Sequence, residues 1–207
     1  MAFQEFLTDG FEDGYQWQQI AAVSIQQWTC GYCGKAVASK DGYFASCSGR
    51  NLPGGYIRIC PNCLGPTFFG PRGQLQPRAA PGKSVTGLPP DLGALYDEAR
   101  RSAAAGAPTA AVLVCRKILM HIGVQEKAEE NRTFLFYVEY LSEHGFVPPN
   151  GKSWVDYVRK RGNEANHEIV IMKDADSMAL ITFVEMLLRF IYEFPNLVPP
   201  VGTAVTP

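Results

Sequence analysis

Hydrophobic residues in the second half of the chain recur at the spacing of helix faces, in segments that end at glycine or proline. Val112, Cys115, Leu119 and Ile122 are three or four positions apart, which places them on one side of an α-helix. With the usual start and stop signals, the predicted helices are residues 91–105, 108–122, 132–144, 152–168 and 175–194. The last is apolar on nearly all sides and stops at Pro195, so we expect it at the centre of a bundle or in a dimer interface.

The first half of the chain has short runs of β-type residues instead. Residues 20–28 and 56–59 favour strands, and residues 39–44, SKDGYF, are typical of a hairpin turn. Proline, glycine and basic residues without periodicity predict a linker further on. The predicted organisation is an N-terminal segment with a small β module (1–69), the linker (70–89), a helical bundle (90–195) and a C-terminal tail (196–207). The predicted fold class is mainly α.

Charge and hydropathy exclude some classes of function. The net charge of −1 at pH 7 gives no reason to expect indiscriminate binding to nucleic acid or membranes. The N-terminal residues lack the continuous apolar block of a signal peptide. The most apolar stretch, residues 178–194, contains Glu185 and Arg189 and is too short and too charged to span a bilayer. We therefore expect a cytoplasmic protein without membrane contact.

Four of the six cysteines form two Cys-x-x-Cys pairs, each with a glycine just after its second cysteine, directly in the first pair (Gly34) and one position later in the second (Gly65). Two residues between the sulfur atoms let both thiolates point into one tetrahedral site, and four thiolates complete a structural zinc centre. A redox pair or two disulfides is the alternative, but in a cytoplasmic chain two such pairs around a hairpin favour Zn²⁺ in a zinc ribbon. Cys47 is expected to be a bystander, and Cys115 a packing residue. The predicted metal ligands are Cys30, Cys33, Cys60 and Cys63.

A second candidate for chemistry is RGNEANHE, residues 161–168. In an intact helix Arg159, Asn163 and His167 lie at intervals of four along one strip, whereas Arg161 and His167 point to different sides. A histidine can act as general base or acid on an RNA 2′-hydroxyl, and an arginine can stabilise charge on the phosphate. The alternative is structural, because the dipole at a helix end also favours basic side chains.

The helical half resembles the bacterial family called domain of unknown function 4145, and behind it the HEPN superfamily of helical RNA-acting domains. Residues 95–122, 161–168 and 174–195 carry the resemblance. The N-terminal ribbon is similar to the zinc module that many members carry. The resemblance implies a HEPN-like bundle of four or five helices that forms a homodimer, and an association with antiviral defence systems.

The HEPN resemblance also implies which residues would form a catalytic site. In active members an arginine, four to six variable residues and a histidine form a metal-independent ribonuclease site, which corresponds here to Arg161 and His167. Active members often place a polar residue directly after the arginine. Here Gly162 takes that position and Asn163 follows it, so this chain departs from the pattern at the candidate catalytic site.

Two functions therefore stay open. The first is a nucleic-acid-associated or defence-associated interaction module that contacts RNA or a protein partner. The second is a metal-independent endoribonuclease that leaves cyclic-phosphate ends. Acidic residues outnumber basic ones by 15 to 12 between Pro90 and Pro195, so an RNA contact there needs a local patch. The clearest patch, and the predicted nucleic-acid contact, is Arg159, Lys160 and Arg161.

Aromatic residues cluster in and after the ribbon. Such rings can stack on nucleic-acid bases, or they can form the core of a small module. Because a small ribbon has little else to bury, packing is the expected role. The residues concerned are Tyr32, Tyr43, Phe44, Tyr56, Phe68 and Phe69.

Overall fold

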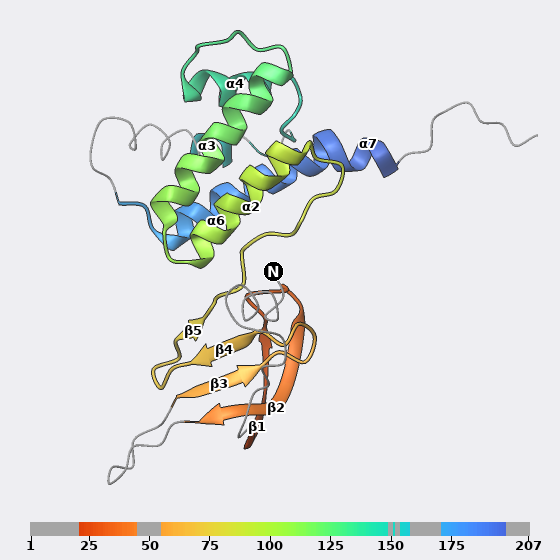
Figure 1. The fold of residues 1–207 in the computed structure, drawn as a ribbon. Helices are drawn as coiled ribbons and strands as arrows, with labels where there is room; N and C mark the ends of the chain where they lie inside the picture. The colour runs from red at the N-terminus through yellow and green to blue at the C-terminus, as the bar shows by residue number, and fades with distance from the viewer. Residues whose placement is uncertain (1–20, 45–54, 149–150, 152–153, 158–170, 198–207) are drawn as a thin grey trace, which may run out of the picture. The chain divides into compact units, whose positions relative to one another are not determined.

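The chain forms two compact units, one built on strands and one on helices. The computed structural model describes residues 21–44, 55–148, 151, 154–157 and 171–197 (Figure 1). The boundary between the units falls between Ala80 and Pro81. The fold is therefore mixed α and β, and the predicted mainly α class is corrected. The sheet is larger than expected because nine-residue strands lie on both sides of the first cysteine pair.

The first unit is an antiparallel sheet in which each strand pairs with the next. Its strands are β1 (Ala21–Thr29), β2 (Ala36–Phe44), β3 (Tyr56–Ile59), β4 (Pro66–Phe69) and β5 (Leu75–Gln76). Arg58 and Thr67 are opposite each other in the register and buried, whereas the neighbouring pair Ile57 and Phe68 is exposed. Because side chains alternate along a strand, the sheet has one buried and one exposed face here.

The buried face holds a small core that includes cysteines. Trp28 and Phe69 meet edge to face, with ring centroids 5.5 Å apart, and Cys30 and Cys60 have no exposed surface. Few other apolar side chains in the described part of this unit are fully buried. So small a core favours a further source of stability, such as a metal.

Arg58 is buried within the same face, with 1% of its surface exposed. Its guanidinium donates to the carbonyl oxygens of Ser24 at 2.5 Å and Ser39 at 3.3 Å. It also lies 5.1 Å from the ring centroid of Tyr56 and 5.4 Å from that of Phe69. This one side chain therefore connects β3 to β1, β2 and β4.

The second unit is a helical assembly in which one helix packs against three others. Its elements are α2 (Pro90–Ala104), α3 (Pro108–Gln125), α4 (Phe134–Glu143), α6 (Asp174–Leu188), the π-helical turn η2 (Arg189–Glu193) and α7 (Phe194–Leu197). α6 packs against α3 and α2, and α3 also packs against α2 and α4 (Figure 1). Ile118, Phe183 and Leu187 are fully buried between them. Among the described helices, none is both long and apolar enough to cross a bilayer.

The sequence predicts that the last apolar helix stops at Pro195. In the structure the helical segment continues to Leu197. A π turn precedes the proline, and the Phe194 amide bonds to the Arg189 carbonyl five residues back. Pro195 then stands in the first turn of α7, where a backbone N–H is not required. The change of hydrogen-bonding pattern therefore accommodates a residue that normally ends a helix.

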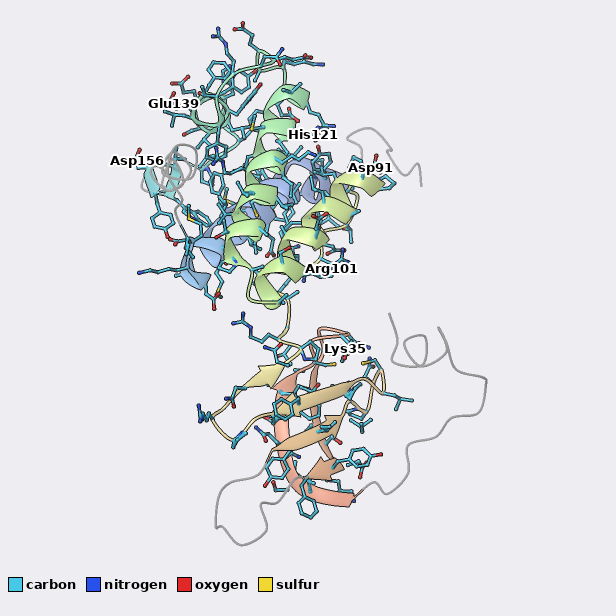
Figure 2. All side chains as sticks on the ribbon, turned by 60° about the vertical axis from the view of Figure 1, so that its left-hand side comes forward. Lys35, Asp91, Arg101, His121, Glu139 and Asp156 are labelled. Carbon is cyan, nitrogen blue, oxygen red and sulfur yellow. The ribbon has the colours of Figure 1, made fainter. Side chains whose placement is uncertain are left out.

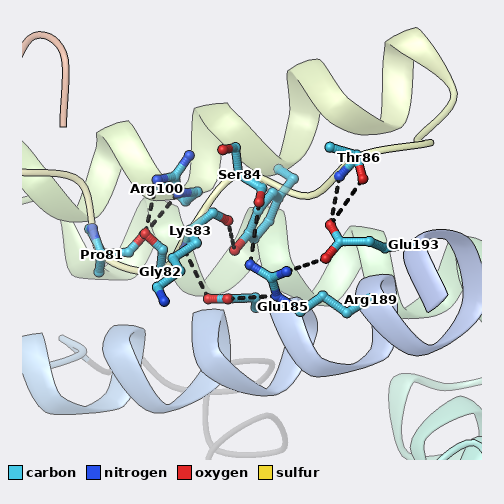
Figure 3. Close-up of polar contacts among 10 residues, drawn as sticks. Pro81, Gly82, Lys83, Ser84, Thr86, Arg100, Glu185, Arg189 and Glu193 are labelled. Atoms are coloured by element: carbon cyan, nitrogen blue, oxygen red, sulfur yellow. Dashed lines mark hydrogen bonds and ion pairs between the residues drawn. The ribbon is translucent and has the colours of Figure 1, made fainter. Parts of the chain in front are cut away.

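Residues 81–86, from the segment predicted to be a linker, are hydrogen-bonded to the helices (Figure 3). Arg100 of α2 donates to two carbonyls of the adjoining backbone, both at 2.9 Å. The Tyr96 hydroxyl donates to the carbonyl of Lys83 at 3.1 Å. The other end of the predicted linker contributes β5 to the sheet, so this segment is divided between the two units.

Carboxylates of α6 and η2 hold the same segment from the other side (Figure 3). The Lys83 amide donates to Oε2 of Glu185 at 3.0 Å, and the Thr86 amide donates to Oε2 of Glu193 at 2.8 Å. Arg189 lies between these two carboxylates and forms ion pairs with both of their Oε1 atoms. Each carboxylate is therefore fixed by the arginine while it accepts a backbone amide.

We expect Glu185→Ala to speed hydrogen exchange of the Lys83 amide by roughly ten-fold, because one hydrogen bond to a charged acceptor is lost. The Thr86 amide serves as an internal control, since Glu193 still accepts it. Amide exchange measured by NMR tests this. If exchange of the Lys83 and Thr86 amides accelerated equally, residues 81–86 would detach as a whole. That result would contradict separate anchoring by Glu185 and Glu193.

Candidate metal centre

The two Cys-x-x-Cys segments adopt the same backbone turn. The amide four residues after each leading cysteine donates to that cysteine's carbonyl, at 2.8 Å for Cys30 and 2.9 Å for Cys60. The amide of each leading cysteine donates in turn to the carbonyl five residues on, at 3.0 Å in both segments. The first turn joins β1 to β2 and the second joins β3 to β4. The strand order therefore brings both turns to the same end of the sheet.

These turns place the four sulfur atoms within 4.8 Å of one another. Sγ of Cys30 lies 3.7 Å from Sγ of Cys63, and Sγ of Cys33 lies 3.8 Å from Sγ of Cys60. Four thiolates about 2.3 Å from a tetrahedral zinc ion are about 3.8 Å apart, whereas disulfide sulfurs are about 2 Å apart. All four cysteines are free thiols, and their geometry fits a metal ion.

The thiols of Cys30, Cys33 and Cys63 do not ionise equally by themselves. Burial raises the pKa of Cys30 to about 12 and also raises the pKa of Cys63. Burial acts in the same direction at Cys33, but hydrogen bonds from the Lys35 amide and from the other thiols outweigh it and lower its pKa to about 7. A divalent ion supplies the charge that lets four thiolates lie together, and its binding releases protons. Because sulfur fills all four positions, such an ion would be structural.

A glycine directly follows the second cysteine in the first turn, whereas Leu64 takes that position in the second turn. Gly34 has a φ of 68°, and the equivalent left-handed position in the second turn is Leu64, with a φ of 60°. This conformation costs an L-residue about 1 kcal/mol. Leu64 is 47% exposed, so burial of its side chain does little to offset that cost.

We expect Leu64→Gly to stabilise the metal-loaded sheet unit by about 1 kcal/mol, because glycine adopts a left-handed φ without steric cost. Gly34→Ala is the matched reverse change, since an added Cβ there meets nothing within 4 Å, and we expect it to destabilise by about 1 kcal/mol. Urea denaturation measures both. Destabilisation by Leu64→Gly would contradict strain at this position.

Contacts between the two turns hold them together. A Cβ on Gly65 would lie 2.5 Å from Cδ2 of Tyr32, so the glycine allows this ring to lie against the second turn. Nζ of Lys35, labelled in Figure 2, donates to Oδ1 of Asn62 at 3.0 Å. Its positive charge also offsets part of the negative charge that four thiolates and one divalent ion would leave.

Cys115 belongs to the helical unit. Cys115 is fully buried in the helical core, where burial raises the pKa of its thiol to about 12. That position agrees with its predicted packing role. Several predictions concern residues outside the described part of the chain, namely Cys47, Arg159, Lys160, Arg161, Asn163 and His167.

Comparison with known proteins identifies the helical unit. The family model described as Domain of unknown function (DUF4145) matches residues 97–201. The match begins within α2 and extends past α7, so it does not include the metal centre, and the wider HEPN resemblance stays a prediction. No curated protein and no solved structure matches the chain. The family match spans half of the sequence, and the chain belongs to the DUF4145 family.

Proposed function

We propose that this protein binds single-stranded RNA through a sheet unit stabilised by zinc. The observation that carries the proposal is an exposed apolar and aromatic row on the sheet, in a segment, residues 21–80, with six basic residues and one acidic residue. In this proposal zinc holds the sheet in shape, and side chains of the sheet contact the nucleic acid.

Basic charge is concentrated in residues 21–80 of the sheet unit, whereas residues 1–20 contain four acidic residues and no lysine or arginine. Between residues 21 and 80 the only acidic residue is Asp41. A Zn²⁺ ion with four thiolates has a charge of −2, so six basic residues and one acidic residue leave residues 21–80 with a net charge of +3, whereas the whole unit, residues 1–80, has five acidic residues and a net charge of −1. The six basic residues are Lys35, Lys40, Arg50, Arg58, Arg72 and Arg78.

The row crosses three strands, with Ile57 and Phe68 exposed and Tyr43 partly buried. Tyr43 of β2 pairs with Ile57 of β3, which pairs with Phe68 of β4, so the three side chains share one face. Ile57 is 36% exposed and Phe68 is 43% exposed. The expected packing role is borne out for Tyr56 and Phe69, which join the core on the other face.

Stacking rings and basic side chains complement each other in binding single strands. An exposed ring can stack on a base whatever its sequence, and lysine or arginine neutralises the phosphates. Lys35, Lys40 and Arg72 are exposed and can make such contacts. Arg58 is buried and bonded within the sheet, so its role is structural.

We expect Phe68→Ala to weaken binding of a short fluorescein-labelled oligouridylate by roughly ten-fold, because one base loses its stacking partner. Phe44→Ala is the matched control: Phe44 is 60% exposed but lies on the opposite face, in register with Tyr56. Fluorescence anisotropy at several salt concentrations measures both. No saturable binding, or an equal loss in the two variants, would overturn the proposal.

A further inference from the structure

The row of Tyr43, Ile57 and Phe68 begins beside the start of β1 (Figure 1). Ala21, the first residue of β1, pairs with Gly42, and the row starts at the next residue of β2. It then crosses β3 and β4, which follow in the order of the sheet. Neighbouring strands are about 4.8 Å apart, so β4 lies about 14 Å from β1. The part of the chain that precedes β1 therefore joins the sheet next to the row.

Residues 1–20, which lie outside the described part of the chain, are opposite in charge to the strands that follow them. They contain four acidic residues and no lysine or arginine, whereas residues 21–80 contain six basic residues and one acidic residue. Among the basic residues, Lys35, Lys40 and Arg72 are exposed. Opposite charges on two adjoining parts of one chain attract each other, and salt weakens the attraction. The sheet is therefore a surface of complementary charge for the N-terminal segment.

The N-terminal segment also carries the side chains that an apolar row can contact. In residues 5–13, EFLTDGFED, the rings of Phe6 and Phe11 stand between acidic residues. Aromatic rings pack favourably against other rings and against aliphatic side chains, and the row offers both kinds. A purely acidic segment would need only the basic side chains. The mixture of acidic and aromatic residues matches a surface that combines basic charge with an exposed apolar row.

The length of chain before β1 is sufficient to reach across the row. Asp13 stands eight positions before Ala21, and eight extended residues span about 26 Å. That reach exceeds the distance of about 14 Å from β1 to β4. A tether this short also gives an effective concentration in the millimolar range. A contact too weak to join two separate copies is therefore well populated within one chain.

We propose that residues 5–13 dock on the row of the same chain and compete there with nucleic acid. The carboxylates take the place of phosphates beside the exposed basic side chains, and the phenylalanine rings take the place of bases. A single strand must then displace the segment to reach the sheet. The docking stands on the row and the charges alone, whereas its effect on nucleic acid rests on the RNA binding proposed above.

Methyl NMR of the zinc-loaded full chain tests the docking without nucleic acid. We expect nuclear Overhauser effects between the Ile57 methyl and the rings of Phe6 or Phe11. Neutralisation of the four acidic residues should remove these effects and shift the Ile57 methyl, and high salt should do the same to wild type. Ile118 of the helical core is the reference methyl. The neutralised variant combines Glu5→Gln, Asp9→Asn, Glu12→Gln and Asp13→Asn.

Fluorescence anisotropy with labelled oligouridylate tests the competition. The neutralised variant should bind roughly ten-fold more tightly than wild type, because the competing segment is released. Phe6→Ala combined with Phe11→Ala keeps every charge and should also tighten binding, which separates docking from a general change of charge. A control variant neutralises four exposed acidic residues of the helical unit and should leave both the affinity and the Ile57 methyl unchanged. It combines Asp91→Asn, Glu98→Gln, Glu130→Gln and Glu143→Gln.

The two measurements fail separately. An Ile57 methyl that is the same in wild type and in the neutralised variant would overturn the docking, whatever the result with oligouridylate. A shift that grows with protein concentration would assign the contact to a second copy and would overturn docking within one chain. If the methyl results hold but no variant binds oligouridylate, the RNA binding proposed above fails, and the competition is overturned with it.

Discussion

Cys60→Ser should abolish the folded sheet unit and leave the helical unit intact. Cys60 is fully buried among the three other thiols and belongs to the same small core as Trp28 and Phe69. A structural zinc ion contributes on the order of 10 kcal/mol to folding at neutral pH, which exceeds the stability expected of so small a unit by itself. Loss of a ligand should therefore have the same effect as removal of the metal.

Limited proteolysis and NMR of the full chain measure this change for each unit separately. A strong chelator added to wild type should reproduce the Cys60→Ser result, and added zinc should reverse the chelator effect but not the mutation. Cys115→Ser is the control, because Cys115 lies in the core of the other unit. A folded, protease-resistant sheet unit in Cys60→Ser would contradict a metal-dependent fold.

Arg58→Ala should destabilise the metal-loaded sheet unit by about 3 kcal/mol. The change removes a large buried side chain and leaves a cavity between the rings of Tyr56 and Phe69. It also deprives the carbonyls of Ser24 and Ser39 of a donor, and the loss at Ser39, which is buried, adds to the cost. A unit of marginal stability would then be partly unfolded at room temperature.

Arg58→Met separates the contribution of packing from that of the guanidinium. Methionine fills most of the same space, and replacement of a buried charge by an apolar residue of similar shape often costs little. We therefore expect a loss of about 1 kcal/mol for Arg58→Met. Chemical denaturation of the zinc-loaded chain measures both variants. Equal losses would show that the hydrogen bonds dominate, and no loss in either would contradict a structural role for Arg58.

Sequence patterns predicted the features that depend on local spacing. The two Cys-x-x-Cys pairs predicted that these four cysteines lie together, because a spacing of two residues lets both thiols of a turn point into one site. The helix stop signals were accurate at Gly106 and Gly145, which adopt φ of 80° and 81° just past α2 and α4. The strand predicted at residues 20–28 appears as β1.

Features that depend on tertiary contacts were not predictable in this way. Nothing local distinguishes Arg58 from a solvent-exposed arginine, because its burial depends on oxygen atoms that β1 and β2 provide. Likewise, residues 81–86 read as a linker because their partners, Glu185 and Glu193, lie about a hundred positions away. Leu64 took the left-handed position because hydrogen bonding fixes the turn whichever residue occupies it.

The central claim is that four cysteine thiolates bind one structural metal ion, and X-ray absorption at the zinc edge tests it most directly. The measurement should use protein purified without added metal, with metal content determined in parallel. We predict one zinc per chain, surrounded by four sulfur atoms at about 2.3 Å. A chain without metal and with its cysteines oxidised to disulfides, or a zinc shell that contains nitrogen or oxygen, would contradict the account.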